Sequence, residues 1–134
     1  MKKAIDLVAE ARSRIETVDS ARLETELAAG ALLVDLREPA EIVEMGRIAS
    51  SVAVPRGMLE FRADPASPYH LEGFDPARRT ILHCASGARS ALGAAALQDM
   101  GYTNVAPTRT SPGGSIRRFW AGSDHSVWRW KSAR

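Results

Sequence analysis

The sequence contains a single cysteine, Cys84, among its 134 residues. The chain therefore cannot form an internal disulfide, and it has no second thiol to which Cys84 could pass a group that it has acquired. Long apolar runs are also missing. No stretch approaches the roughly 20 residues of a membrane-spanning helix, and acidic residues interrupt the first segment before a secretory signal could form. These absences predict a soluble protein in a reducing, cytoplasmic compartment.

Aromatic residues are scarce, at 6%, but hydrophobic residues make up 45% of the chain and charged residues 25%. This composition excludes a fibrous or disordered protein and predicts one globular domain over residues 1–134, with its core in about residues 17–120. The charges are unevenly placed, because residues 105–134 hold six of the 18 Lys and Arg but only one of the 16 Asp and Glu. For the basic, aromatic tail 121–134, poor order is the simpler expectation, and binding to nucleic acid is the less favoured one.

Short apolar strands alternate with segments of helical periodicity along the chain. This alternation predicts an α/β fold with a mainly parallel sheet. Caps and breakers help to set the limits, since Asp19 is a good N-cap and Gly30 a good helix stop. The predicted helices cover residues 4–15, 20–29, 38–46, 56–63 and 89–100, and the predicted strands cover residues 31–35, 51–54, 80–83 and a last strand that starts at 102–105.

Cys84 stands where the strand 80–83 gives way to a loop of small residues and then to a helix. Free amide groups at a helix start, together with the helix dipole, favour a negative charge, so we expect this thiol to lose its proton more readily than a free cysteine. Gly87 can adopt the positive φ that a tight loop requires. Arg89 supplies a permanent cation or braces the loop, and Ser90 caps the helix or donates its hydroxyl toward the sulfur. Without further signals, a lone cysteine would be read as a small buried hydrophobe.

Three motifs resemble those of the rhodanese-like sulfurtransferases. The spacing C-x4-R-S from Cys84 to Ser90 is similar to the active-site loop of that family. Residues 34–41, VDLREPAE, resemble its V-D-x-R-E-P-x-E element, and residues 51–55, SVAVP, resemble its A-x-N-I-P strand. The motifs occur in the family's order over roughly residues 18–105, which is far more specific than a lone cysteine motif.

The resemblance implies a rhodanese-like fold, with a mainly parallel central sheet flanked by helices on both faces. It implies that Cys84 takes a sulfane sulfur from thiosulfate or a similar anionic donor as a persulfide, and passes it to cyanide, a cellular thiol or a protein sulfur acceptor. The loop that would bind substrate and persulfide consists of Ala85, Ser86, Gly87, Ala88, Arg89 and Ser90. No metal or organic cofactor is implied, and the three histidines lack metal-ligand spacing.

The residues of the earlier element are assigned a structural role. Asp35 ends a buried strand, and a buried carboxylate must find a partner, so Asp35, Arg37 and Glu38 are expected to form an ion pair and a helix cap that support the site.

Two other functions remain open. The same fold could serve as a binding or sulfur-carrier module that does not turn over. Rhodanese-like phosphatases carry H-C-x5-R, and His83 precedes Cys84 here, but the loop is one residue shorter than theirs and suits a single sulfur atom better than a phosphate. A phosphatase or an arsenate reductase is therefore the less favoured alternative. The chain also departs from the family after Val105, because the segment before Gly113 and Gly114 is about three residues longer than in the family. Phe119 and Trp120 are nevertheless expected to lie in the family's final helix.

Overall fold

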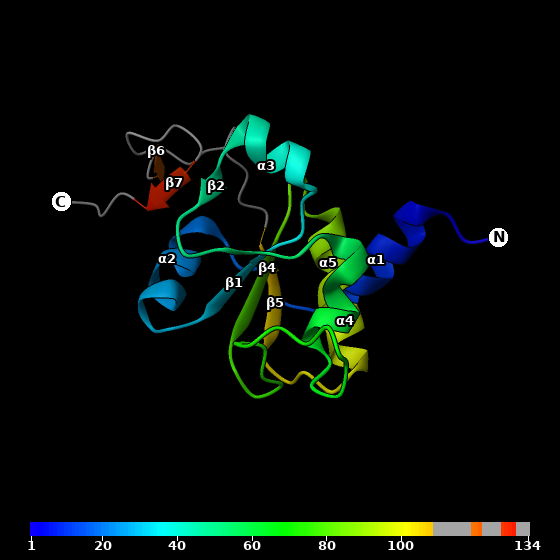
Figure 1. Cartoon of the computed structure of the whole chain (residues 1–134). Helices are drawn as coiled ribbons and strands as arrows, with labels where there is room; N and C mark the ends of the chain where they lie inside the picture. Colours follow the sequence, from blue (N-terminus) through cyan, green and yellow to red (C-terminus); the bar gives the residue numbers. More distant parts are fainter. Residues whose placement is uncertain (109–118, 122–126, 131–134) are drawn as a thin grey trace.

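The computed structural model describes residues 1–108, 119–121 and 127–130 (Figure 1). The α-helices are α1 (Ala4–Arg14), α2 (Ser20–Ala28), α3 (Pro39–Met45), α4 (Leu59–Ala63) and α5 (Ala88–Asp99), and a 3-10 turn, η1, covers Arg56–Met58. The strands are β1 (Leu32–Asp35), β2 (Arg47–Ile48), β3 (Val52–Ala53), β4 (Thr80–His83), β5 (Val105–Thr108), β6 (Phe119–Ala121) and β7 (Val127–Trp130).

Four strands form a parallel sheet in the order β3-β1-β4-β5. Leu32 of β1 pairs with Thr80 of β4, and Thr80 pairs with Val105 of β5. Pro107 is tolerated in β5 because this strand lies at the edge, where the proline carbonyl accepts the Val18 amide at 2.9 Å. The carboxyl ends of all four strands meet at one edge of the sheet, which is where α/β sheets bind ligands.

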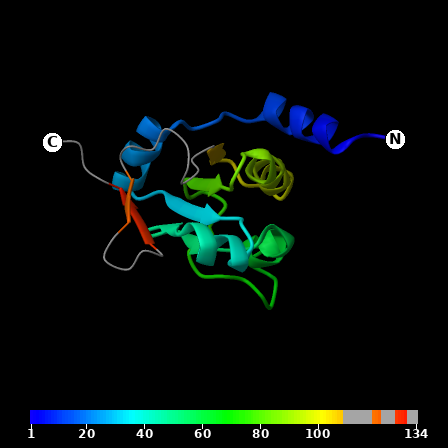
Figure 2. The same cartoon turned by 90° about the horizontal axis from the view of Figure 1, so that it is seen from above.

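Helices cover both faces of this sheet, as the family resemblance implies (Figure 2). Val34 and Leu82 pack toward α4 and α5, together with Leu59 and Leu97. The alternate residues of the same strands form a second core on the other face, against α2; its buried members are Val18, Leu23, Leu33, Ile48, Ile81 and Ala106. Period-two alternation thus gives each strand two buried faces, which explains why these strands read as continuous apolar runs.

Glycine allows α5 to lie close to the sheet. A Cβ at Gly93 would stand 2.9 Å from the Leu36 side chain and 3.0 Å from that of Leu59, so a larger residue would force these leucines apart. On its outer side α5 carries α1, where Ala11 packs with Ala91 and a neighbouring alanine of α5. Small residues on both sides of α5 therefore set the spacing of three layers.

Most predicted elements are confirmed, including the Asp19 cap of α2, whose carboxylate accepts the Arg22 amide at 2.8 Å. The last sheet strand is shifted, because β5 begins at Val105 instead of at Tyr102. Tyr102 is buried, and its hydroxyl donates to the Ala63 carbonyl at 2.7 Å. Burial raises the pKa of Tyr102 to about 12.

The C-terminal segment corrects a second prediction. Phe119 and Trp120 lie in strand β6 and not in a helix. β6 pairs antiparallel with β7, and β7 pairs parallel with β2. The free edge of β2 and the aromatic residues of this segment, which favour strands, therefore decide against the helix that the family resemblance implies here. Of the tail 121–134, residues 122–126 and 131–134 lie outside the described part, so its expected poor order stays a prediction there.

Candidate active site

Cys84 follows β4 directly and is fully buried. Its Sγ accepts hydrogen bonds from the Gly87 amide at 3.1 Å and the Ser90 amide at 3.3 Å. The thiol itself donates to the Ser90 Oγ at 3.5 Å. Two backbone N–H donors and one hydroxyl therefore surround a single sulfur atom. Groups of this kind stabilise a negative charge on the sulfur.

The loop owes its shape to Gly87, whose φ of 90° confirms the predicted positive angle. This left-handed turn starts α5 at Ala88 and points the Gly87 amide back at the sulfur. The two preceding residues, Ala85 and Ser86, are exposed. Ser90 lies in the first turn of α5 and is buried; its Oγ lies 3.0 Å from the Gly87 carbonyl and 3.3 Å from the carbonyl of Thr108. Ser90 thus joins the cysteine loop to β5.

The guanidinium of Arg89 does not extend freely into solvent, because Glu41 of α3 binds it. The two terminal nitrogens of Arg89, Nη1 and Nη2, each donate to one carboxylate oxygen of Glu41 at 2.8 Å. The hydrogen bond from Arg89, helped by the Glu38 amide, lowers the pKa of Glu41 to about 2. The same contact raises the pKa of Arg89. Both side chains are about one third exposed, so the pair lies at the rim of the site.

Asp35 and Arg37 form a buried ion pair at the end of β1. Arg37 donates from its Nε to Asp35 at 3.0 Å and from a terminal nitrogen at 2.8 Å. The same terminal nitrogen binds the Gly46 carbonyl at 2.8 Å, which ties the end of α3 back to the sheet. Burial raises the pKa of Asp35, but hydrogen bonds from His83 and Arg37 outweigh it and hold this pKa well below its usual range.

His83 lies beside Asp35 in the neighbouring strand. The register places Asp35, His83 and Thr108 in one row across β1, β4 and β5, and all three are fully buried. The Nε2 of His83 stands 3.2 Å from the Asp35 carboxylate. The residue before the cysteine is therefore anchored to β1 by its side chain as well as by its backbone.

The structure brings most of the predicted site residues to one edge of the sheet. Glu38 is exposed and caps α3, and its amide donates to Glu41 at 2.7 Å. Sequence reasoning missed Glu41 as the partner of Arg89, although Glu41 closes the acidic element that it had singled out. It also gave His83 no particular role.

No cluster of His, Cys, Asp and Glu side chains within the described ranges is placed to hold a metal ion. Nor is any described helix long and apolar enough to cross a membrane. An open pocket of about 600 Å³ lies at the opposite end of the sheet, before β1 and β4. Its Arg79 is held by Glu26 at 2.5 and 2.9 Å and by Asn104 at 3.0 Å. This pocket is separate from the cysteine loop.

The chain belongs to the rhodanese-like domain family, whose model matches residues 19–108. The match ends at the last residue of β5, so β6 and β7 lie beyond it. This membership confirms the resemblance of the three motifs.

Individual relatives agree with this assignment. A sulfurtransferase from Allochromatium vinosum is 33% identical over 93 residues, which cover 68% of this chain and 78% of that protein. A human single-domain sulfurtransferase has a similar structure, with a TM-score of 0.60, 25% identity, and coverage of 71% of this chain and 89% of the human one. Another similar structure, from Rhodopseudomonas palustris, is a protein of unknown function described as a possible tyrosine phosphatase. It has a TM-score of 0.78, 39% identity, and coverage of 84% and 88%. The family and the two sulfurtransferases support sulfur transfer in general, whereas the third relative is described as a possible phosphatase.

Proposed function

We propose that the protein is a sulfurtransferase that carries a sulfane sulfur as a persulfide on Cys84. The observation that carries the proposal is the pair of amide donors, from Gly87 and Ser90, on one buried Sγ at 3.1 and 3.3 Å. Donors in this position stabilise the Cys84 thiolate, both as the nucleophile that attacks the donor and as the leaving group when the sulfur is passed on. Membership of the family and the sulfurtransferase relatives support sulfur transfer in general.

In the first half-reaction the Cys84 thiolate attacks the outer sulfur of thiosulfate or a similar donor. The new bond joins Sγ to that sulfur, the sulfur–sulfur bond of thiosulfate breaks, and sulfite leaves with the bonding electrons. In the second half-reaction, cyanide or a thiolate attacks the outer sulfur, and Cys84 leaves as the thiolate. The sulfur is transferred without a cofactor, and the enzyme returns to its starting state.

Residues 85–90 form the binding loop in this proposal. The exposed Ala85 and Ser86 admit the substrate, and Gly87, Ala88 and Ser90 position the amides. Ser90 also turns its hydroxyl toward the sulfur once the thiol proton is lost, because the thiol no longer donates to it. Arg89 acts chiefly as a brace, since Glu41 holds its guanidinium at two points. Asp35, Arg37 and Glu38 support the loop from β1 and α3.

The acceptor is an external molecule, because the chain has one cysteine. We propose a small anionic sulfur donor, and a thiol, cyanide or a protein as acceptor. We further propose that residues 1–134 work as one domain. A cytoplasmic location stays a prediction.

The test combines an assay with a mass measurement. The protein is incubated with thiosulfate and cyanide, thiocyanate is followed, and Cys84→Ser is compared with the wild type at equal concentration. We expect the variant to lose turnover and the wild type to gain the mass of one sulfur atom on Cys84 after thiosulfate alone. Unchanged turnover in Cys84→Ser would contradict the proposed mechanism. A stable persulfide without turnover would favour a sulfur carrier.

A phosphatase is the second candidate, favoured by the description of the Rhodopseudomonas palustris relative. In this role Cys84 would attack phosphorus and Arg89 would hold the phosphate oxygens. The loop from Cys84 to Arg89 is one residue shorter than in H-C-x5-R, and Glu41 already occupies the Arg89 guanidinium. A phosphotyrosine or p-nitrophenyl phosphate assay that shows Cys84-dependent release of phosphate would establish this candidate instead.

A further inference from the structure

The cysteine loop contains one charged residue, Arg89, and Glu41 already binds both of its terminal nitrogens. The buried Arg37 is engaged in the same way, because its Nε and one terminal nitrogen both donate to Asp35. An anionic donor gains little from a guanidinium whose charge and paired N–H groups are matched by a carboxylate. A donor that carries a sulfonate group therefore needs a different cation at this edge of the sheet.

Arg56 begins the 3-10 turn η1, three residues after the end of β3 and at the same edge of the sheet. Its amide donates to the Leu36 carbonyl at 3.1 Å, and the Leu36 amide donates to the His83 carbonyl at 2.9 Å. Leu36 thus lies between the backbone of Arg56 and the peptide that leads into Cys84. The two backbones are two strand spacings apart, which is about 10 Å.

The side chains of Arg56 and Cys84 also lie on the same side of the sheet. Cys84 belongs to the core cluster that contains Leu36 and Leu59, the first residue of α4. The Arg56 side chain contacts the same helix, where its Nη1 donates to Glu60 at 2.6 Å. Because Arg56 is 28% exposed, it meets solvent beside the sulfur that it helps to surround.

The guanidinium of Arg56 is held at one point. Among the described residues, only its Nη1 has a carboxylate partner, and that partner, Glu60, is 44% exposed. The Nε and Nη2 groups form the fork that binds two oxygens of an oxyanion side by side. An exposed ion pair of this kind contributes little, so Glu60 leaves most of the Arg56 charge available to a ligand.

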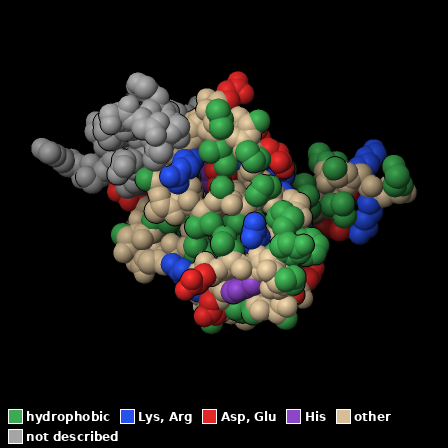
Figure 3. All heavy atoms as spheres, in the orientation of Figure 1, with side chains coloured by type: hydrophobic (Ala, Val, Ile, Leu, Met, Phe, Trp, Pro, Cys, Tyr) green, Lys and Arg blue, Asp and Glu red, His purple; other side chains and the backbone are tan. Residues whose placement is uncertain are grey.

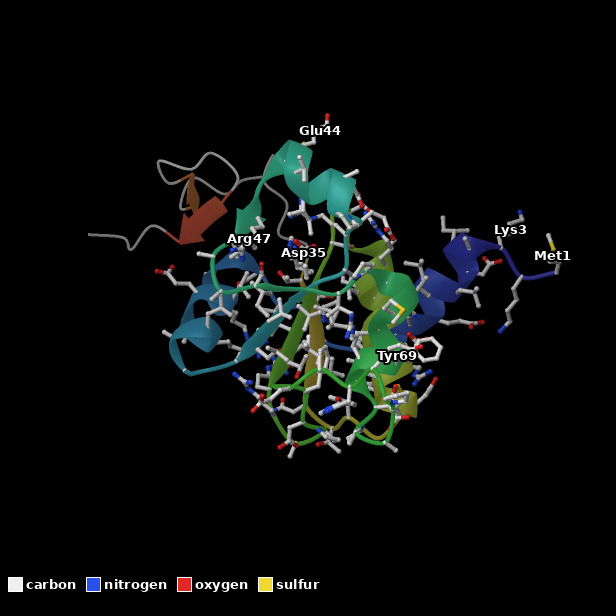
Figure 4. The ribbon with its side chains drawn as sticks, in the orientation of Figure 1. Met1, Lys3, Asp35, Glu44, Arg47 and Tyr69 are labelled. Atoms are coloured by element: carbon white, nitrogen blue, oxygen red, sulfur yellow. The ribbon has the colours of Figure 1, made fainter. Side chains whose placement is uncertain are left out.

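Two other arginines near this face are directed elsewhere. Arg47 extends from β2, on the other side of Asp35 from α4 (Figure 4). Arg62 of α4 donates to the carbonyl of Tyr69 at 3.3 Å, and Tyr69 lies on the side of α4 away from α3 (Figure 4). On the face seen in Figure 3, Lys and Arg side chains lie singly among other groups and not in clusters. Arg56 is therefore the arginine of the described part that is best placed to reach a donor at the sulfur.

We propose that Arg56 binds the oxyanion head of the sulfur donor, and so makes the protein prefer donors whose transferable sulfur is attached to a sulfonate-type group. The inference rests on the proposed function. A donor whose outer sulfur stands about 3–3.5 Å from Sγ extends its anionic head away from the buried sulfur, toward Arg56. Arg56 holds these oxygens while Sγ bonds to the outer sulfur, the old sulfur–sulfur bond breaks, and sulfite leaves with the bonding electrons.

The first test uses two alkylating agents of nearly equal size as probes. Iodoacetate and iodoacetamide both bring their reactive carbon to Sγ and extend their other end away from it, but only iodoacetate is an anion. The ratio of their rates on Cys84, followed by mass spectrometry on the full-length protein, cancels changes in thiol ionisation and access. We expect Arg56→Gln to lower this ratio about fivefold, and by less at high salt.

The other variants separate direct binding from a general effect of charge. Glu60→Gln leaves Arg56 without its carboxylate partner and should raise the ratio about twofold. The same change in an Arg56→Gln background should have little effect, because the gain acts through Arg56. Arg56→Lys keeps the charge but loses the fork, so it should restore part of the ratio. Arg62→Gln, which removes the same charge from α4, is the matched control and should leave the ratio unchanged.

The donor provides the second measurement. Loading of Cys84 by thiosulfate, a dianion, should become about fivefold slower in Arg56→Gln. Loading by methanethiosulfonate, which carries one negative charge fewer, should slow less. Transfer from the loaded Cys84 to β-mercaptoethanol, a neutral thiol, should be unchanged, because the oxyanion head has already left.

An unchanged ratio of the iodoacetate and iodoacetamide rates in Arg56→Gln, or an equal fall in Arg62→Gln, would overturn the proposal. A gain from Glu60→Gln that is as large in the absence of Arg56 would overturn it as well. These outcomes differ from failure of the proposed function, in which Cys84 gains no sulfur from thiosulfate although the alkylation ratio still depends on Arg56. A Cys84 that reacts with none of these reagents would contradict both proposals.

Discussion

Glu41 and Arg89 bind each other through two contacts of 2.8 Å, and this ion pair joins α3 to the first turn of α5. The two residues are distant in sequence but meet at the rim of the cysteine loop. The pair fixes the orientation of the loop's only charged side chain, so it connects the acidic element of β1 and α3 to the sulfur site.

Glu41→Gln is expected to change reactivity more than stability. The pair is about one third exposed, so its loss should cost about 1 kcal/mol or less of the free energy of unfolding. The loop amides lose their brace, and the rate of Cys84 persulfide formation should fall about tenfold. Urea unfolding and timed mass spectrometry measure the two effects. Glu44→Gln, the same change on an exposed part of α3, is the control; an equal loss in both variants would contradict the role of the pair.

Asp35→Asn is expected to destabilise the fold strongly. The change leaves the buried Arg37 guanidinium without its counter-charge, which should cost about 3–5 kcal/mol of the free energy of unfolding. Asp99→Asn, at the exposed ion pair with Arg14, is the matched control and should cost about 1 kcal/mol or less. Losses of similar size in the two variants would contradict this prediction.

The pH dependence provides a second measurement at Asp35. Its pKa is lower in the folded protein than the usual 3.8, so its contribution to stability is present above that pH. The contribution is lost as the pH falls through the folded pKa. Wild type should therefore lose more stability than Asp35→Asn between about pH 5 and pH 2. If the stability of wild type and of Asp35→Asn fell equally with pH, the lowered pKa of Asp35 would not contribute to stability.

Gly93→Ala tests the close approach of α5 to the sheet. The added methyl group would lie 2.9 to 3.2 Å from the side chains of Leu36, Leu59 and Leu82. Overpacking of about 1–3 kcal/mol should exceed the gain of about 1 kcal/mol in helix propensity, so the melting temperature should fall. At Gly57 nothing lies within 4 Å of an added Cβ, and Gly57→Ala should leave the melting temperature nearly unchanged. A stabilised Gly93→Ala would show that the leucines move aside without cost.

Local signals were enough to predict much of the fold. Asp19 and Gly87 act at the positions where their own chemistry places them, as a helix cap and as a left-handed turn. The buried strands β1 and β4 followed from short apolar runs, and the cysteine at the end of β4 followed from the strand limit. These features depend on neighbours within a few residues.

The remaining features depend on contacts between distant segments. Arg89 could pair with any of several acidic residues, and only the parallel packing of β1 beside β4 brings Glu41 to it. His83 reaches Asp35 for the same reason. β6 is a strand because it pairs with β7, which in turn pairs with β2. The residue pattern around Phe119 and Trp120 does not reveal this long-range pairing.

The strand order β3-β1-β4-β5 also governs how the protein folds. β1 can pair with the nearby β3, but its pairing with β4 joins Leu32 to Thr80, and the long intervening chain has to be closed as a loop first. Such non-local parallel pairing slows folding compared with a helical bundle of equal length. During synthesis, Cys84 leaves the ribosome before β5 can pair with β4. The nascent chain therefore exposes its only thiol until the last sheet strand has docked.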